Sequence, residues 1–276
     1  MKKILSLLLA VAMLAGCMLV MASCGQPTLK VGYTVYAPMN FYDNDGDVLD
    51  GDDGSGDFVG FDTELALLVA EKLGMKVQFV EIDWNNKYSE LNSGAIDCIW
   101  NGFTSNSKDA DGIERSEKVD FSYAYLDNAQ CVVVKAADLA AYTSVESLAG
   151  KKGAAEGGSA GETYALSVTD SDKVVPADVQ TDTFTELLAG AVEFVVVDRL
   201  LAENIVGKGD YAALAIVEAI EIEKEVYSIG CKKGGDLDDK INNALVELLN
   251  EGKIEELAAK YNVRVTDTLM AKKTAE

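Results

Sequence analysis

The stretch GAIDCIWNGFTSNSKDADGIERSEKVDFS, residues 94–122, decides the fold because it joins a helix end, a buried strand and a polar loop. Gly94 is suited to end a helix. Residues 96–100 form a short, mainly apolar run that predicts a buried strand. The loop after such a strand is where open α/β sheets place their ligands. The stretch therefore predicts an α/β sheet with a binding loop at the tip of this strand.

The loop Asn101-Gly102-Phe103-Thr104 carries groups that suit a small polar ligand. Gly102 lets the backbone approach a ligand closely, because it has no side chain. Asn101 offers an amide and Thr104 a hydroxyl. Arg115 follows in an acidic segment, and a guanidinium is the natural partner of a carboxylate. The alternative is a strand, a polar loop and an arginine on the surface.

Composition excludes several classes of function. The 276 residues are enough for two lobes with cores of their own. The formal net charge of −22 argues against nucleic acid and against an anionic membrane surface as partners. The chain has no histidine, which removes Ser-His-Asp and Cys-His catalysis and histidine metal sites. We therefore predict no enzymatic activity, no metal and no cofactor.

The N-terminus predicts export and lipidation. Residues 1–23 have a basic start and a long apolar run, which is typical of a signal peptide. The alternative is an uncleaved membrane anchor, since the run is near spanning length. Cys17 and Cys24 each end a segment that resembles a bacterial lipoprotein cleavage box. Cys17 has the better consensus, but the apolar run ends only at Cys24, and we therefore favour Cys24 as the lipidated residue.

An acidic segment, residues 43–57, contains many aspartates and glycines and no base. Clustered carboxylates suit calcium. However, the spacing does not match the EF-hand pattern, so a solvated loop is the preferred interpretation.

The second half of the chain offers two further candidates. Residues 151–159 predict a strand and a glycine turn that lead into a helix, and the N–H groups at a helix start bind anions. We expect Ser159 and nearby amides to hold a ligand carboxylate. Asp198 ends an apolar strand and is placed to accept an ammonium, or alternatively to cap the next helix. Residues 157–161 also fit the G-x-S-x-G pattern, but no histidine is available as its base.

The order of these segments resembles a known family. LKVGYTVYAPMNF (29–41), GFDTELALLVAEKLG (60–74), the opening stretch and GAVEFVVVD (190–198) are similar to the polar amino-acid-binding proteins of ABC importers, the family 3 extracellular solute-binding proteins. The resemblance runs from about residue 29 to 262. It implies an α/β, two-lobed periplasmic-binding-protein-like fold, with two doubly wound sheets joined by two crossing hinge strands.

The resemblance also implies roles for particular residues. Tyr36 would stack on the ligand, and Trp84 would face it. Lobe one would comprise residues 29–128 with 227–276, and lobe two residues 129–226. The segment between Thr104 and Val119 is longer than the family pattern, so Arg115 lies either in the cleft or outside it.

The expected function is that of a monomeric lipoprotein on the outer face of the cell membrane. It would capture an amino acid by hinge closure and deliver it to the permease and ATPase of an ABC importer. A dehydratase on the same fold and a ligand-sensing module are the alternatives.

Overall fold

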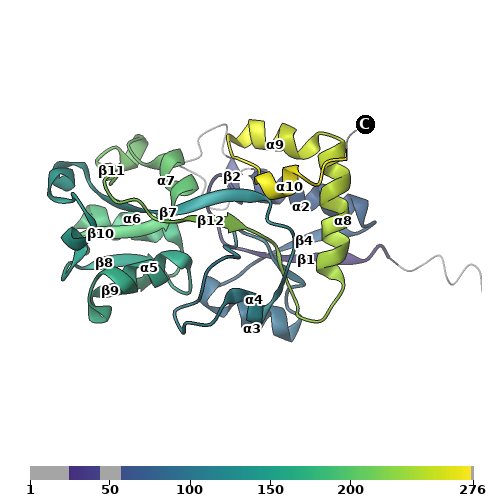
Figure 1. Cartoon of the computed structure of the whole chain (residues 1–276), viewed down its shortest axis with the longest axis horizontal. Coiled ribbons are helices and arrows are strands. Elements are labelled where there is room, and N and C mark those ends of the chain that lie inside the picture. The colour runs from purple at the N-terminus through teal and green to yellow at the C-terminus, as the bar shows by residue number, and fades with distance from the viewer. Residues whose placement is uncertain (1–24, 44–56, 275–276) are drawn as a thin grey trace, which may run out of the picture.

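The computed structural model describes residues 25–43 and 57–274, and in this part of the chain two β-sheets form the cores of two lobes (Figure 1). The predicted signal peptide, both candidate lipidation cysteines and most of the acidic segment 43–57 lie outside the described residues. The two-lobed α/β fold that the sequence predicts is confirmed.

Lobe one is built on a sheet with strand order β4-β1-β5-β13-β6, in which β1 runs parallel to both β4 and β5. Strands β2 and β3 form a separate hairpin, and α2 packs against α8 and α9. The elements are β1 (Thr28–Tyr33), β2 (Phe41–Asp43), β3 (Asp57–Val59), α2 (Phe61–Lys72), β4 (Lys76–Glu81), α3 (Lys87–Ser93), β5 (Cys98–Ile99), α4 (Arg115–Lys118), β6 (Asp120–Phe121), β13 (Gly230–Cys231), α8 (Leu237–Asn250), α9 (Lys253–Tyr261) and α10 (Asp267–Met270).

Lobe two is built on a sheet with strand order β11-β7-β10-β8-β9, in which β8 runs parallel to β10 and β9. Its elements, including the two strands that it shares with the hinge, are β7 (Leu126–Lys135), β8 (Gly153–Glu156), α5 (Ala160–Val168), β9 (Val174–Ala177), α6 (Gln180–Ala189), β10 (Phe194–Asp198), α7 (Arg199–Ile205), β11 (Leu214–Ile216) and β12 (Lys224–Tyr227).

The second sheet is covered on both faces, because successive residues of a strand point to opposite sides. Phe194 and Val196 of β10 belong to one buried cluster together with Ala165 of α5. Val195 of the same strand belongs to another, together with Phe184 of α6. This is the doubly wound arrangement that the sequence predicts, and it turns the carboxyl ends of β8, β9 and β10 toward lobe one.

Two antiparallel strands connect the lobes. β7 and β12 pair from Lys224 opposite Ala129 to Tyr227 opposite Leu126, and both run between the lobes in Figure 1. They are the predicted crossing strands, and β7 continues without a break from the crossing into the sheet of lobe two. We retain the lobe boundaries given above, 29–128 with 227–276 and 129–226, as a proposal.

Local signals predicted the end of one helix correctly and one strand too long. Gly94 ends α3 in the left-handed conformation, as expected, and Gly190 ends α6 in the same way. The strand expected over 96–100 is shorter, since only Cys98 and Ile99 make ladder pairs. Asp62, in the first turn of α2, makes no capping bond and is buried.

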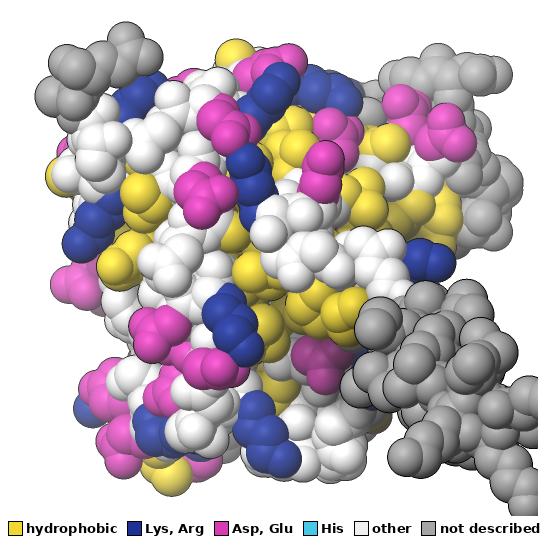
Figure 2. Space-filling view, turned by 90° about the vertical axis from the view of Figure 1, so that its right-hand side faces the viewer, with side chains coloured by type: hydrophobic (Ala, Val, Ile, Leu, Met, Phe, Trp, Pro, Cys, Tyr) yellow, Lys and Arg dark blue, Asp and Glu magenta, His cyan; other side chains and the backbone are white. Residues whose placement is uncertain are grey.

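The surface of lobe one that faces away from lobe two is mixed in charge. Figure 2 shows acidic and basic side chains interspersed there, with hydrophobic side chains between them. Within the described ranges, no helix has the length and apolar character needed to cross a bilayer.

Candidate functional site

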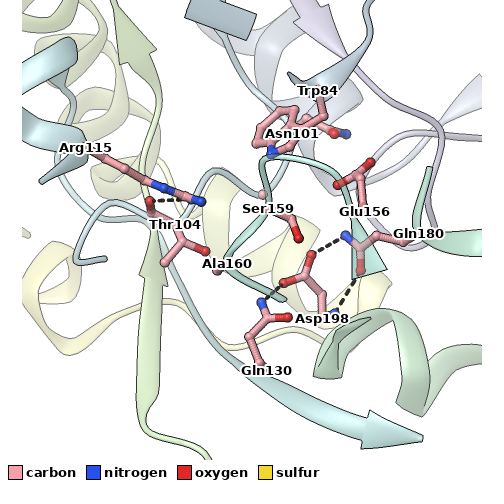
Figure 3. Close-up of a pocket in the computed structure, with 11 residues that line it drawn as sticks. Trp84, Asn101, Thr104, Arg115, Gln130, Glu156, Ser159, Ala160, Gln180 and Asp198 are labelled. Atoms are coloured by element: carbon pink, nitrogen blue, oxygen red, sulfur yellow. Dashed lines mark hydrogen bonds between the residues drawn. The ribbon is translucent and has the colours of Figure 1, made fainter. Parts of the chain in front are cut away.

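A cavity lies between the lobes, and most of its lining residues follow the carboxyl ends of parallel strands, where α/β sheets bind ligands (Figure 3). Trp84 follows β4 in lobe one, and the loop with Gly102 follows β5. In lobe two, Ser159 follows β8 and Asp198 ends β10. The full lining is Trp84, Asn101, Gly102, Thr104, Arg115, Gln130, Glu156, Ser159, Ala160, Gln180 and Asp198.

The two walls of the cavity nearly meet. The volume open to the centre of a water molecule is about 10 Å³, which is room for about one water. Among the described residues, hydrogen bonds join the two walls: Lys87 Nζ donates to Gly158 O at 2.8 Å, Arg115 Nη2 to Gly158 O at 3.4 Å and Thr34 Oγ1 to Glu156 Oε1 at 3.4 Å. An amino acid therefore enters only when the walls part and these bonds break.

Lys87 is an unexpected part of this closure. Its ammonium is buried and also donates to Trp84 O at 3.1 Å, with the Trp84 ring 5.1 Å away. Burial, together with the positive charge of Arg115, lowers the pKa of Lys87 to about 7.

The Gly102 loop is held in place by a hydrogen bond to the buried Asp62. Its amide donates to Asp62 Oδ2 at 2.8 Å, and the Tyr125 hydroxyl donates to the same oxygen at 2.9 Å. The buried Asp62 thus braces the binding loop, which is why it does not cap α2; burial raises its pKa to about 7. Gly102 has φ of 56°, and a Cβ there would lie 1.8 Å from the Tyr36 hydroxyl. Only glycine fits this position.

Asn101 has a different role from the predicted one. Its Oδ1 accepts from the amide of Thr34 at 3.0 Å, and its Nδ2 donates to Thr34 O and to Asn40 Oδ1, each at 2.7 Å. The side-chain amide is therefore used within lobe one, where it ties the chain after β1 to the chain after β5. Asn101 lines the cavity but has little capacity left for a ligand.

Tyr36 also departs from its predicted place. Its ring is 2% exposed and belongs to the main buried cluster, and it is absent from the residues that line the cavity. Its hydroxyl packs closely against Gly102, where an added Cβ would lie 1.8 Å away. Trp84, by contrast, lines the cavity as expected, and its ring meets Phe103 edge-on at 5.4 Å.

Arg115 lies in the cavity wall, which resolves the alternatives that the longer segment before it left open. The side chain is 1% exposed. Its Nε donates to Asp109 Oδ1 at 2.9 Å, its Nη1 donates to Thr104 O at 3.1 Å, and the guanidinium stacks 5.2 Å from the Phe103 ring. The longer segment therefore supplies Asp109, which fixes the guanidinium in place. Burial opposes ionisation of Asp109, but Lys118 and Arg115 outweigh it and hold its pKa below the usual value.

Ser159 stands at the start of α5, as expected. Its Oγ accepts from the amide of Glu162 at 3.0 Å, and the Glu162 carboxylate accepts from the amide of Gly158 at 2.7 Å. This is a capping arrangement that holds the glycine turn against the helix. The first amides of a helix have no partner within it and favour an anion. The hydroxyl of Ser159 is used as a cap acceptor, so the G-x-S-x-G pattern has a structural explanation.

The carboxyl group of Asp198 accepts hydrogen bonds from side-chain amides. Asn128 Nδ2 and Gln130 Nε2 donate to its Oδ1 at 2.8 and 2.6 Å, and Gln180 Nε2 donates to its Oδ2 at 2.5 Å (Figure 3). It makes no side-chain bond to the start of α7, so the capping alternative is wrong. The three amides hold the carboxyl group at the cavity wall.

A second acid lies behind Asp198. Glu225, on the crossing strand β12, accepts from the same Asn128 and Gln130 amides at 2.5 and 2.7 Å. Burial and the neighbouring Asp198 raise the pKa of Glu225 to about 8, and burial raises that of Asp198. Burial therefore opposes ionisation of both carboxyl groups, and the charge of Asp198 further opposes that of Glu225.

Sequence reasoning missed Gln130, Gln180 and the place of Glu156. A signal was present for Gln130, because β7 reads LDNAQCVVVK and places polar amides in an otherwise apolar strand. Gln180 is the first residue of α6 and its sequence context is ordinary. Only the folded chain brings it to Asp198. The two residues are joined by a pair of hydrogen bonds, because Gln180 Oε1 also accepts from the Asp198 backbone amide at 2.8 Å.

Comparison with protein families gives two matches. The model of the bacterial extracellular solute-binding proteins, family 3, matches residues 29–264. The model of the prokaryotic membrane lipoprotein lipid attachment site matches residues 1–17, and so ends at Cys17.

Individual relatives agree with the first match. The chain is 26% identical over 211 residues to the arginine-binding extracellular protein ArtP of Bacillus subtilis (strain 168), which covers 74% of this chain and 77% of that protein. The structure of an ancestral arginine-binding protein bound to arginine has a TM-score of 0.73 and 33% identity, covering 86% of this chain and 98% of the other.

A third similar structure is that of a binding protein described as the precursor of an enzyme. The ancestral amino-acid-binding protein AncCDT-1, described as a precursor of cyclohexadienyl dehydratase, has a TM-score of 0.70 and 28% identity, with 85% and 95% coverage.

Proposed function

Because the chain belongs to family 3 of the bacterial extracellular solute-binding proteins, we propose that it captures an amino acid between its lobes for an ABC importer. The observation that carries this proposal is the pairing of Arg115 from lobe one with Asp198 from lobe two at one cavity. A guanidinium and a carboxylate on opposite walls match the two charges of a zwitterion.

We assign the ligand's α-carboxylate to Arg115, with the Thr104 hydroxyl and the amides at the start of α5 as further donors. Asp198 receives the α-ammonium, and Trp84 covers part of the side chain. Ala160 lines the cavity with no hydroxyl of its own. Tyr36 and Asn101 act behind this surface, as parts of the scaffold that holds the loop.

Closure follows from the placement of these groups. Lobe one and lobe two each hold one end of the ligand, so only the closed form satisfies both charges, and binding shifts the hinge equilibrium toward it. A permease and an ATPase, encoded elsewhere, would receive the ligand from the closed form. The chain acts as a binding protein and not as an enzyme in this proposal.

We expect one or a few amino acids to bind with a dissociation constant on the order of micromolar or tighter, near −8 kcal/mol. At a hundredfold excess over this constant, binding stabilises the native state by about 2.7 kcal/mol. For a chain of this size the melting temperature then rises by roughly 5–10 °C. A thermal-shift screen of the twenty amino acids and close derivatives checks this. A flat screen would contradict the proposal.

An enzyme is the second candidate because Glu156 is a buried acid in the cavity. Burial, with the nearby charge of Asp198, raises the pKa of Glu156 to about 8, so the group holds a proton at neutral pH as a general acid must. An assay with arogenate or prephenate separates the two functions, and we expect no turnover.

The chain is a lipoprotein of the extracytoplasmic side, as the attachment-site match indicates. That match ends at Cys17, which supports Cys17 over Cys24, the residue favoured by the length of the apolar run. We therefore expect the mature protein to begin at a diacylated Cys17. Mass spectrometry of the membrane fraction measures this directly. Loss of lipidation in Cys24→Ala but not in Cys17→Ala would reverse the assignment.

A further inference from the structure

Glu156 is a cavity residue that recognition of a simple zwitterion leaves unused. Its side chain is 3% exposed, and among the described residues it accepts one hydrogen bond, the long one from Thr34 Oγ1 at 3.4 Å. Among the described residues, no lysine or arginine nitrogen lies within ion-pair distance of its carboxyl group. The carboxyl group therefore keeps acceptor capacity for a ligand.

The charges around the cavity are unbalanced. Arg115 is the base among the described lining residues, and it is already paired with Asp109. Lys87 lies near the cavity and its charge favours ionisation of Glu156, but burial lowers the pKa of Lys87 itself to about 7. Two acids line the cavity, Glu156 and Asp198, and Glu225 lies directly behind the second. An α-carboxylate and an α-ammonium bring equal and opposite charge, so a simple zwitterion leaves this excess of acid in place. Burying a carboxylate without a cation is costly, so Glu156 keeps its proton in the absence of a cation, and a ligand that carries a second cation allows it to ionise.

The position of Glu156 fits the far end of a ligand. In Figure 3, Arg115 enters from one side of the cavity, whereas Glu156 and Trp84 lie on the other. A ligand whose α-carboxylate meets Arg115 therefore directs its side chain toward Glu156. The Trp84 ring in the same wall adds a surface that attracts cations.

We propose that Glu156 makes this site selective for amino acids whose side chain carries a cationic group, such as a guanidinium or a terminal ammonium. The inference rests on the proposed function, since it assigns the side-chain end of the same ligand. When such a cation binds, the Glu156 carboxyl ionises and its proton passes to the solvent.

The test compares arginine with citrulline, which has nearly the same shape but no side-chain charge. By calorimetry on the wild-type protein we expect arginine, lysine or ornithine to bind at least about tenfold more tightly than citrulline or glutamine. Glu156→Gln should lose this preference by weakening the cationic ligand about tenfold or more, while citrulline binding stays within about threefold. Glu193→Gln, which removes an exposed acid of lobe two, is the charge-matched control.

Proton release gives a second measurement. At pH 7 the calorimetric enthalpy of the cationic ligand should depend on the ionisation enthalpy of the buffer, and less so in Glu156→Gln. Citrulline that binds wild-type protein as tightly as arginine, or a preference that survives in Glu156→Gln, overturns this inference and leaves the proposed function intact. Failure of every amino acid to bind overturns the proposed function itself.

Discussion

Replacing Asp198 by alanine is expected to nearly abolish amino-acid binding while the protein still folds. The α-ammonium of the ligand would be desolvated in the closed cavity without a partner. Loss of a buried charged partner costs about 2–5 kcal/mol. Affinity then falls roughly thirtyfold at the low end and several thousandfold at the high end. Calorimetry with the best ligand from the thermal-shift screen measures the loss.

Folding should survive this change for a structural reason. Asp198 makes no capping bond to α7, so the helix start does not depend on it. Glu225 still accepts from Asn128 and Gln130, so two of the three amide donors keep a partner.

Two further variants control the experiment. Asp198→Asn keeps the shape and removes the charge, and it should lose affinity almost as strongly as the alanine variant. Asp172→Ala removes an exposed acid of the same lobe and should bind normally. Wild-type affinity in Asp198→Ala would mean that the ammonium is bound elsewhere.

Replacing Arg115 by alanine is the second change with a large expected effect. The guanidinium is the group that we assign to the ligand's α-carboxylate, and it lies buried at the cavity wall. Its removal should again cost about 2–5 kcal/mol of binding free energy, roughly thirtyfold or more in affinity. Arg115→Lys should recover only part of the loss, because an ammonium lacks the planar fork that meets both carboxylate oxygens.

The matched control is an arginine outside the site. Arg199→Ala removes one positive charge from α7, where Arg199 pairs with Glu203 and Glu218 at the surface. It should bind as the wild type does. Melting curves of the ligand-free variants separate loss of binding from loss of folding, since Asp109 keeps Lys118 as a partner when Arg115 is removed. Binding within about threefold of wild type in Arg115→Ala would place the carboxylate elsewhere.

The sequence by itself predicted many of the elements, because periodicity and terminating glycines depend on neighbours in the chain. Polar groups at strand tips and helix starts are suited to ligands, so Gly102, Thr104, Ser159 and Asp198 could be proposed for the site before any coordinates. The two-lobed arrangement and the place of Trp84 were implied by the family resemblance.

The tertiary structure decided which of these groups remain available to a ligand. In the sequence, Asn101 and Asp62 look like polar groups that could bind a ligand. In the fold, each is hydrogen-bonded to a segment far away in the chain. The carboxyl group of Asp198 lines the cavity and also accepts from side-chain amides that come from β7 and α6. Hydrogen-bond satisfaction in a buried site is a property of the whole fold, because every polar group there must find a partner among whatever the packing brings near.

Burial explains why Tyr36 and Glu156 have different places in the structure from those that the sequence suggested. Tyr36 was placed at the ligand by resemblance, but its ring is buried in the main cluster and its hydroxyl packs against Gly102. Glu156 is one acid among many in the sequence, whereas in the fold it is enclosed beside Asp198 without a cation at ion-pair distance in the described chain. Burial shifts the pKa of such a carboxyl group only where water is excluded from around it. That exclusion depends on how the two lobes pack, which local sequence signals do not determine.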